Sequence, residues 1–543
     1  MSLLASRSRT LRFLALLTAF CATASLRAQT PTLTLESVNA EVSGAFGTAV
    51  AAVEDIDGDG LADLAIGAPQ ENDGASDAGR VYVFSSADGT SLLTLESPNS
   101  ESSGAFGDAV AGVPDVDGDG LGDLLIGAPR EDGGAGNAGR AYLFSGTGAL
   151  LLTLESTTPE SNGFFGTSVA AVPDTDGDGL ADLLVGAPEE DDGATNAGRL
   201  YLFSGDDGAL LQQRRSPNPQ VVGAFGNAVA GVPDTDGDGR GDLLVGAFQE
   251  NAGADGAGRA YLLSGDDGSL LLTLESPNAR PVGAFGASVA AVSDTNGDGV
   301  ADLFIGADQE DAGPEGSGRA HLFSGADGSL LLSLVSPHTQ PLGFFGHAVA
   351  GVPDVDGDGR GDLLVGAIQE DAGGERSGRA YLFGGADGAS LLRMRSPNAN
   401  VLGFFGNAVA GVPDTNGDGR GDLLIGAPQE DGGAGDAGRA YLVEGMVVLA
   451  AEGGPDAGGL DLGVTPNPTR SRTALAFTLS QPGPAHLRLF DALGREVAVL
   501  AAGIHGAGRH EVEVDAARLV PGVYLARLET SDAVAVRSLV IVQ

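Results

Sequence analysis

The sequence predicts an all-β protein, in which a seven-bladed β-propeller with four-stranded blades is followed by a small Ig-like β-sandwich. Three observations lead to this fold class. A unit of about 60 residues recurs seven times, and each unit holds four short apolar runs separated by turn residues. A different pattern of alternating runs begins near residue 464. With 543 residues and 42% apolar content, the chain is long enough to bury both cores.

The repeat is marked by a phenylalanine-glycine pair. Its phenylalanines are Phe46, Phe106, Phe165, Phe225, Phe285, Phe345 and Phe405, at spacings of 60, 59, 60, 60, 60 and 60 residues. Runs such as NAVAGV, DLLVGA, RAYLLS and LLLTLES have the length of strands and are bounded by Gly, Asp, Asn or Pro. Four strands per unit are typical of a propeller blade. A leucine-rich solenoid needs a shorter period, and a helical repeat needs a 3.6-residue periodicity that these units lack.

The ring is expected to close through its N-terminus. The run LTLESVN at 33–39 precedes the first Phe-Gly pair and matches the fourth run of the other units, which the last unit lacks. We therefore predict that this run supplies the outer strand of the last blade, which removes two exposed sheet edges. The alternative is that MVVLAA at 446–451 takes that place.

Each unit carries the pattern D-x-[DN]-x-D-G-x-x-D between its first and second runs. Carboxylates at positions 1, 3, 5 and 9 and the backbone carbonyl at position 7 can converge on one ion, while the glycine at position 6 allows the sharp turn. Calcium prefers six to eight oxygen ligands at flexible geometry, whereas magnesium demands a strict octahedron. The twelfth position, where an EF-hand has glutamate, is Ile66 in the first unit, so the loops are not complete EF-hand loops. A plain Asp-Gly turn is the alternative for a single copy, but seven copies in phase favour calcium.

The sequence thus predicts up to seven calcium ions, one per blade. The predicted metal ligands, loop by loop, are Asp55, Asp57, Asp59, Leu61 and Asp63; Asp115, Asp117, Asp119, Leu121 and Asp123; Asp174, Asp176, Asp178, Leu180 and Asp182; Asp234, Asp236, Asp238, Arg240 and Asp242; Asp294, Asn296, Asp298, Val300 and Asp302; Asp354, Asp356, Asp358, Arg360 and Asp362; and Asp414, Asn416, Asp418, Arg420 and Asp422. The two asparagines each remove one charge, so their loops are expected to bind more weakly.

The N-terminal residues 1–28 have the pattern of a secretory signal. Three arginines precede the short apolar run FLALLTAF, and LRAQ offers a cleavage point after Ala28. The one cysteine, Cys21, lies inside this segment, so no disulfide is expected in the mature chain. No later segment has 18 consecutive apolar residues, which predicts no transmembrane helix. A net charge of −45 disfavours nucleic acid and anionic membranes as partners and favours cations.

The Phe-Gly pair, the acidic loop and the following Gly-Ala-Pro together resemble the FG-GAP repeat of integrin α-subunit propellers and their bacterial relatives. Gly-Ala-Pro is intact at Gly67–Pro69, Gly127–Pro129, Gly186–Pro188 and Gly426–Pro428. The resemblance covers residues 31–445. It implies a seven-bladed propeller with calcium at one rim and a role in adhesion or ligand binding. In this chain all seven units carry the acidic loop, whereas integrins carry it on only some, and the even spacing leaves no room for an inserted domain.

The tripeptide Arg-Gly-Asp occurs at Arg240–Asp242, Arg360–Asp362 and Arg420–Asp422. A motif recognised by a partner needs a protruding carboxylate. These aspartates are position 9 of their acidic loops, so we expect them to face the ion rather than solvent.

A linker of residues 446–463 separates the propeller, residues 29–445, from a C-terminal module of residues 464–543. The segments PNP, LFDALGREV and PGVYLARL in this module resemble the C-terminal sorting domain of the type IX secretion system. The resemblance implies export across a bacterial outer membrane, with the secretion machinery as a partner. The alternative is an accessory sandwich.

No catalytic constellation stands out. The six histidines, His321, His338, His347, His486, His505 and His510, do not recur in phase with a partner, and no nucleophile elbow or phosphate-binding loop is present. We expect a secreted or outer-surface calcium-binding propeller that is not an enzyme and binds an unidentified extracellular protein or glycan. The alternatives are a structural surface-layer or matrix component and an enzyme acting on polysaccharide.

Overall fold

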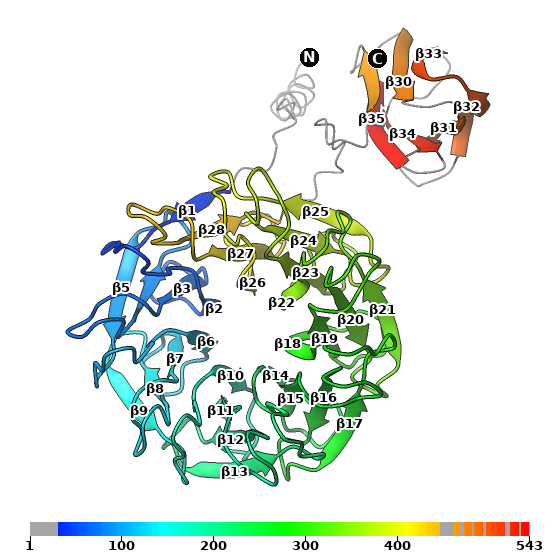
Figure 1. The fold of residues 1–543 in the computed structure, drawn as a ribbon. Helices are drawn as coiled ribbons and strands as arrows, with labels where there is room; N and C mark the ends of the chain where they lie inside the picture. Colours follow the sequence, from blue (N-terminus) through cyan, green and yellow to red (C-terminus); the bar gives the residue numbers. More distant parts are fainter. Residues whose placement is uncertain are drawn as a thin grey trace, which may run out of the picture.

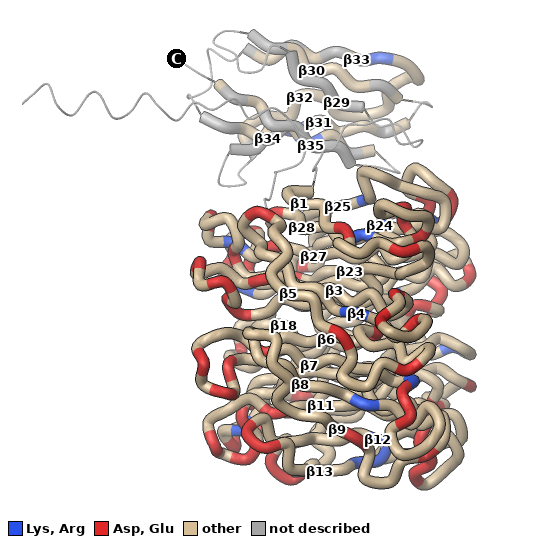
Figure 2. Tube along the Cα trace, turned by 90° about the vertical axis from the view of Figure 1, so that its left-hand side faces the viewer, with Lys and Arg blue, Asp and Glu red and all other residues tan. Residues whose placement is uncertain are grey.

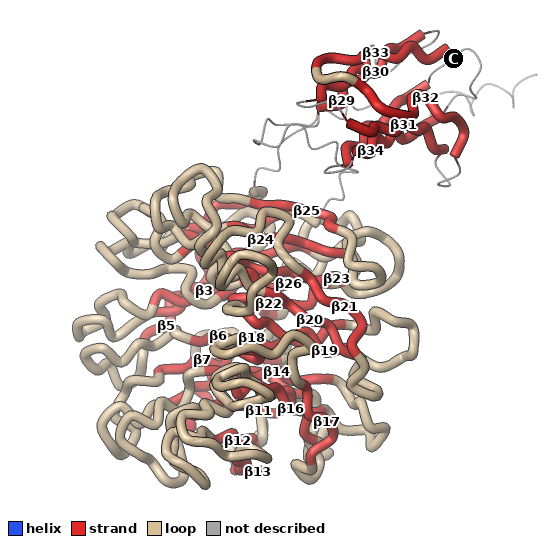
Figure 3. The backbone as a smooth tube through the Cα atoms, turned by 45° about the vertical axis from the view of Figure 1, so that its right-hand side comes forward, coloured by secondary structure: helices blue, strands red, loops and turns tan. Residues whose placement is uncertain are grey.

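The computed structural model describes residues 31–445, 461–465, 472–479, 483–491, 496–515, 522–530 and 534–541. Residues 31–445 form a ring of seven sheets (Figure 1), and Figure 3 shows that the regular elements of this ring are strands joined by loops. Every sheet of the ring has four strands in antiparallel order. The predicted seven-bladed propeller is therefore confirmed. The predicted signal, residues 1–28, lies outside the described residues.

We number the blades 1 to 7 along the chain, each from its inner to its outer strand. Blades 1 to 4 contain β2(Val50–Val53), β3(Asp63–Ala68), β4(Arg80–Phe84) and β5(Ser91–Glu96); β6(Ala109–Val113), β7(Asp123–Ala128), β8(Arg140–Phe144) and β9(Leu150–Leu154); β10(Ser168–Val172), β11(Asp182–Ala187), β12(Arg199–Phe203) and β13(Leu210–Arg215); and β14(Val229–Val232), β15(Asp242–Ala247), β16(Arg259–Leu263) and β17(Leu270–Leu274). Blades 5 to 7 contain β18(Phe285–Val292), β19(Asp302–Ala307), β20(Arg319–Phe323) and β21(Leu330–Leu334); β22(Phe345–Val352), β23(Asp362–Ala367), β24(Arg379–Phe383) and β25(Ser390–Met394); and β26(Val409–Val412), β27(Asp422–Ala427), β28(Arg439–Val443) and β1(Leu33–Leu35).

The N-terminal strand closes the ring. β1 pairs antiparallel with β28, and Thr34 lies opposite Tyr441. Leu35 is buried in one apolar cluster with Phe46 of blade 1 and Leu442 of blade 7. The prediction that the N-terminal run completes the last blade is confirmed, and residues 446–451, the competing segment, lie outside the described residues.

The apolar core consists of clusters between neighbouring blades. At the seam of blades 1 and 2, for example, Val81 and Leu95 of blade 1 pack with Phe106 and Tyr142 of blade 2. The phenylalanine of the repeat is fully buried there. Gly79 makes its close approach possible, because a Cβ on this residue would lie 2.1 Å from the Phe106 carbonyl oxygen, and its φ of 92° is one that glycine adopts without strain.

A buried polar cluster also joins neighbouring blades at six of the seven seams of the described ring. At the seam of blades 1 and 2, Ser97 follows the outer strand of blade 1 and donates to Glu131 of blade 2. The Tyr142 hydroxyl donates to the same carboxylate, and Arg140 Nη1 lies 3.3 Å from Glu131 Oε2. Burial raises the pKa of Glu131, and these donors lower it. The cluster therefore links two blades through one satisfied carboxylate.

The antiparallel order sets the two faces of the ring. In each blade, the loop between the first and second strands lies at one end, together with the turn between the third and fourth strands. We call this end the acidic-loop face. The loop between the second and third strands and the connection to the next blade lie at the opposite end, the connection face. Figure 2 shows acidic residues in the loops on both sides of the ring.

The C-terminal residues form two further sheets. The first has the order β29(Asp461–Thr465), β30(Arg472–Leu479) and β33(Gly508–Asp515), and the second has β32(Glu496–His505), β31(Gly483–Asp491), β34(Gly522–Thr530) and β35(Val534–Ile541). Phe477 of the first sheet and Leu487 and Leu528 of the second are buried in one cluster. Two sheets around a shared core form a β-sandwich. Its Ig-like character stays a prediction.

Candidate metal centres

Each acidic loop joins the first strand of its blade to the second, and we number the loops with their blades. In loop 1, Asp55 folds the chain around itself: its Oδ1 accepts a bond of 2.6 Å from the Gly58 amide, and its Oδ2 accepts one of 2.7 Å from the Gly60 amide. Both glycines have φ above 80°, in the left-handed region. The Leu61 amide donates to Asp59 Oδ1 at 2.8 Å. The loop is thus shaped by its own carboxylates.

Position 9 differs from the other acidic positions because it begins a buried strand. Asp63 is fully buried, and its Oδ2 accepts a bond of 2.8 Å from the Ile56 amide. Its Oδ1 is buried with no hydrogen-bond partner among the described residues. Burial raises the pKa of Asp63 to about 6, and the charges of Asp57 and Asp59 add to this rise. A buried carboxylate oxygen without a donor is what a cation site requires.

Burial of position 9 recurs around the ring, but in the other six loops Oδ1 also accepts a backbone amide, at 2.7 to 3.3 Å. Burial raises the pKa of Asp123 to about 6 and that of Asp362 to about 7. Burial also raises the pKa values of Asp182, Asp242, Asp302 and Asp422, where a neighbouring threonine hydroxyl and backbone amides lower them in part.

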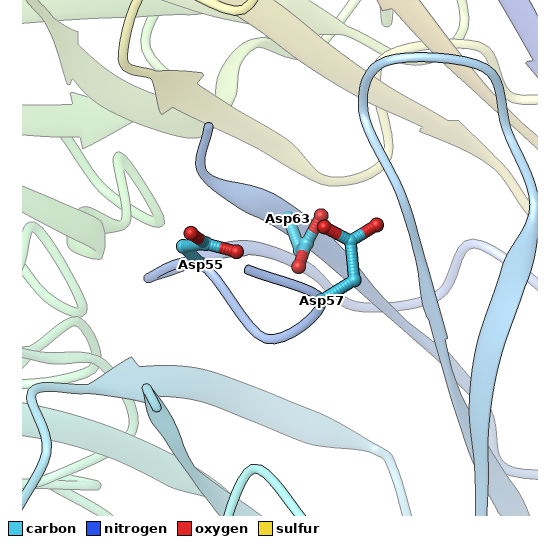
Figure 4. A group of neighbouring side chains, drawn as sticks. All are labelled: Asp55, Asp57 and Asp63. Carbon is cyan, nitrogen blue, oxygen red and sulfur yellow. The ribbon is translucent and has the colours of Figure 1, made fainter. Parts of the chain in front are cut away.

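In each of five loops, three carboxylates have oxygen atoms that lie within 4.8 Å of one another. Figure 4 shows the first of these groups, in which Asp55 and Asp57 approach Asp63. The groups are Asp55, Asp57 and Asp63; Asp115, Asp117 and Asp123; Asp174, Asp176 and Asp182; Asp234, Asp236 and Asp238; and Asp354, Asp356 and Asp362. Positions 1, 3 and 9 therefore meet in four loops, whereas loop 4 brings together positions 1, 3 and 5.

The predicted position-5 ligands Asp59, Asp119, Asp178 and Asp358 stand outside these groups. Each accepts the amide of position 7 in its own loop, at 2.7 to 2.9 Å. The second oxygen of Asp119 also has a partner outside its loop, because Oδ2 accepts a hydrogen bond of 2.8 Å from the Ser145 hydroxyl.

Loops 5 and 7 carry asparagine at position 3. In loop 5, Asn296 Nδ2 donates to Asp298 Oδ2 at 2.8 Å and to Asp302 Oδ1 at 3.4 Å. The amide nitrogen thus occupies the space between two carboxylates that a cation would bridge. A turn of the amide group would present its oxygen instead.

The donor set fits a hard divalent cation. The converging side-chain atoms are oxygens, the charge is concentrated, and in loop 1 one buried oxygen, Asp63 Oδ1, lacks a donor. In loops 1, 2, 3 and 6 such a cation would be held by positions 1, 3 and 9, and it would supply positive charge next to the buried position-9 carboxylate.

The comparisons with known proteins agree with this architecture. The FG-GAP repeat matches residues 46–84, 106–144, 165–203, 225–263, 285–323, 345–383 and 405–443. The chain belongs to the FG-GAP repeat family. Each match begins at the phenylalanine of the repeat and ends with the third strand of a blade, so it spans one acidic loop.

Curated relatives of these FG-GAP repeats include integrin α subunits. The chain is 32% identical to integrin alpha-5 of Xenopus laevis over 220 residues, which are 37% of this chain and 20% of the relative. It is 34% identical to human integrin alpha-IIb over 276 residues, which are 45% of this chain and 25% of the relative. The chain thus matches a quarter or less of these relatives. Among solved structures, BamB from Moraxella catarrhalis matches 77% of this chain and 99% of its own at 10% identity, with a TM-score of 0.37.

The C-terminal residues of this FG-GAP protein match a secretion system C-terminal sorting domain over residues 463–542. This domain directs proteins through the type IX secretion system, so the chain is a cell-surface or extracellular protein. In the described residues, no helix has both the length and the apolar character needed to span a membrane.

Sequence reasoning missed the role of the position-7 side chains in the FG-GAP loops. The sequence predicts Arg240, Arg360 and Arg420 only as backbone ligands. Arg240 Nη1 lies 3.1 Å from Asp174 Oδ1, across the seam in loop 3. Arg360 donates to the Thr295 carbonyl of loop 5, and Arg420 to the Val355 carbonyl of loop 6. The visible signal was the change from Leu or Val to Arg at this position in three of seven loops.

The Arg-Gly-Asp tripeptides are not displayed. Asp242, Asp362 and Asp422 are fully buried, as expected for position 9. The glycines pack against the neighbouring blade, because a Cβ on Gly241 would lie 2.5 Å from the Pro173 carbonyl oxygen.

Proposed function

We propose that this protein is a secreted, calcium-stabilised binding module whose connection face captures an extracellular protein and which acts without catalysis. Calcium, one ion per loop and up to seven in all, is the cation that the oxygen donors favour. The integrin relatives support an adhesive role, as does the sorting domain that places the chain at the cell surface or outside.

The observation that carries the binding proposal is a set of exposed apolar residues in a strained backbone. Val222, Val282, Leu342 and Leu402 have φ values of 60°, 58°, 56° and 62°. Their side chains are 44%, 61%, 47% and 40% exposed. We call these four residues the apolar tips. They occupy the same place in the connections that cross the four consecutive seams from blade 3 to blade 7.

The apolar tips lower the stability of the folded chain, because they place side-chain-bearing residues in a left-handed backbone. A left-handed backbone costs a side-chain-bearing residue about 1–2 kcal/mol, and β-branched residues are rare in it. The same place holds Ser43, Ser103 and Asn162 in the other three connections, which shows that polar residues are compatible with the turn. Exposed apolar side chains gathered on one face indicate an interaction surface.

The charge beside the tips indicates the partner. Three tips bond through their amides to the carbonyls of exposed acidic residues: Val282 to Asp255, Leu342 to Glu315 and Leu402 to Glu375, at 2.8, 2.8 and 2.9 Å. An apolar centre beside carboxylates complements a protein surface with an apolar patch edged by lysine or arginine. The absence of tryptophan from the chain weighs against sugar stacking.

The test is a binding screen of the purified full chain against extracellular matrix proteins, glycans and bacterial surfaces, with millimolar calcium. A variant combining Val222→Ser, Val282→Ser, Leu342→Ser and Leu402→Ser is expected to lose at least tenfold in affinity, with an unchanged or higher unfolding temperature. The control is Leu270→Ser, which removes an apolar residue that is 47% exposed on an outer strand. Equal binding by the tip variant would contradict the assigned surface. If the folded, calcium-loaded chain binds nothing in the screen, a structural surface-layer role is favoured. If it releases product from a polysaccharide, an enzyme is favoured.

A further inference from the structure

We propose that Arg240, Arg360 and Arg420 tune the cation affinity of the preceding blade, so that the seven loops fill in a graded order. The inference rests on the proposed cation binding and deepens it. Each arginine supplies the position-7 backbone of its own loop, but its guanidinium crosses a seam into another loop.

Arg240 competes directly for a ligand oxygen. Its Nη1 contacts Asp174 Oδ1, which belongs to the group with Asp176 and Asp182. The guanidinium covers the loop closely, because a Cβ on Gly177 would lie 2.3 Å from Arg240 Nη2. The two side chains are 27% and 32% exposed, so the ion pair is partly shielded from solvent. A cation entering loop 3 must displace this guanidinium or bind beside its charge.

Arg360 and Arg420 act beside the ligands rather than on them. They donate to the carbonyls of Thr295 and Val355, the position-2 residues of loops 5 and 6. The amides of these two residues hold the buried position-9 carboxylates Asp302 and Asp362, at 2.9 and 2.8 Å. Each guanidinium therefore adds positive charge next to a loop without occupying a carboxylate.

Among the described residues, loops 1, 2, 4 and 7 receive no such contact from a position-7 side chain. Position 7 is Leu61, Leu121 and Leu180 in the first three blades and Val300 in blade 5. Leu180, for example, packs into the apolar cluster at the seam of blades 2 and 3. The same structural position thus holds leucine, valine or arginine, and only arginine brings charge to the neighbouring loop.

Charge then ranks the loops. Loops 1, 2 and 4 hold four carboxylates each, for a formal −4, without a neighbouring guanidinium. Loops 3 and 6 hold four carboxylates and one guanidinium, and loop 7 holds three carboxylates, so these three loops are at −3. Loop 5 holds three carboxylates and one guanidinium, for −2. We expect loops 1, 2 and 4 to fill first and loop 5 last.

The arginines also link the loops in series. Arg420 joins loop 7 to loop 6, and Arg360 joins loop 6 to loop 5. A cation in loop 6 would fix the backbone of Arg360, whose guanidinium contacts loop 5. Cation binding in loop 6 is therefore coupled to cation binding in loop 5. Such coupling is reciprocal.

The test counts bound calcium ions on the full chain by native mass spectrometry, as free calcium rises from micromolar to millimolar. The natural chain is expected to load in at least two steps. In Arg240→Leu/Arg360→Leu/Arg420→Leu, the last ions should bind at about three- to tenfold lower calcium concentrations, and the steps should merge.

Two control variants isolate the effect. Arg214→Leu removes the same charge at the seam of blades 3 and 4, where Arg214 donates to the Asp267 carbonyl on a β-turn, and it should leave the loading curve unchanged. Leu61→Arg brings a guanidinium to loop 7 and should shift one ion to higher calcium. Identical curves for the natural chain and the triple variant would overturn this inference alone. A folded natural chain that takes up no calcium at millimolar concentration would overturn the proposed cation binding as well.

Discussion

At the scale of single residues, the seven position-9 aspartates stand apart from the other loop acids. The sequence presents Asp63 as one of four equivalent carboxylates, but the structure buries it fully and leaves one of its oxygens without a donor. Asp55 keeps a different role, because it shapes the loop by accepting two backbone amides. A cation would therefore relieve the cost of burying Asp63 more than that of any exposed partner.

The raised pKa values predict the pH dependence of the cation-free protein. The pKa of Asp63 rises from 3.8 to about 6, and that of Asp362 from 3.8 to about 7. The folded chain therefore binds a proton at each carboxylate more tightly than the unfolded chain does. The resulting stabilisation is complete below about pH 4 and is lost as the pH rises through 6 and 7. In a chelator, the contribution of these groups therefore makes the unfolding temperature higher at pH 5 than at pH 8.

Asp63→Asn provides the matched check on this prediction. The amide removes the buried charge, so thermal unfolding in chelator at pH 8 should occur at a temperature equal to or above that of the natural chain. Calcium should then stabilise the variant less, because loop 1 has lost a ligand. A natural chain in chelator whose stability falls steadily from pH 8 to pH 5 would contradict the assignment.

At the scale of elements, the ring depends on a three-residue strand. β1 pairs with β28 and places Leu35, only 3% exposed, in the core of the closing seam. The buried polar clusters repeat this dependence at five seams. The serine after the outer strand bonds to the glutamate of the next blade, as Ser97 does to Glu131, or to the tyrosine beside it, as Ser156 does to Tyr201. An outer strand thus stabilises two blades at once.

Removing residues 31–38 is expected to open the ring. The loss of Leu35 and of the strand pairing should cost about 3–5 kcal/mol, and it would expose β28 as an edge that favours aggregation. Thermal unfolding and light scattering on chains that begin at residue 31 or at residue 39 measure both effects. Equal unfolding temperatures and equal hydrodynamic radii would show that another segment closes the ring.

At the scale of the whole molecule, the net negative charge lowers the stability of the folded ring. A net charge of −45 destabilises a compact chain by self-repulsion, and the seven acidic loops, which lie on one face of the ring, hold 26 of the 74 acidic residues. Cations bound in the loops would offset this repulsion and stiffen the blades, while the apolar tips on the opposite face remain free to bind.

Calcium is therefore expected to raise the global stability. For a dissociation constant of about 10⁻⁴ M, 1 mM calcium adds about 1.4 kcal/mol per site, or about 10 kcal/mol if all seven loops fill. Calorimetry in 1 mM calcium, in 1 mM magnesium and in chelator should show a large increase for calcium and a smaller one for magnesium. Three equal melting curves would contradict cation binding by the loops.

The repeat by itself determined the fold, because seven units in phase leave one way to bury four short strands each: in blades stacked around an axis. It also determined the acidic positions and the closing strand, since LTLES recurs in the outer runs of units 1, 2 and 4. The tertiary structure alone decided that Asp63 Oδ1 has no donor, that Ser97 of one blade reaches Glu131 of the next, and that Arg240 reaches Asp174, 66 residues away in the chain. The contacts of Ser97 and Arg240 cross the seams between blades. A repeat pattern describes one blade at a time, so it does not contain the distances from one blade to the next.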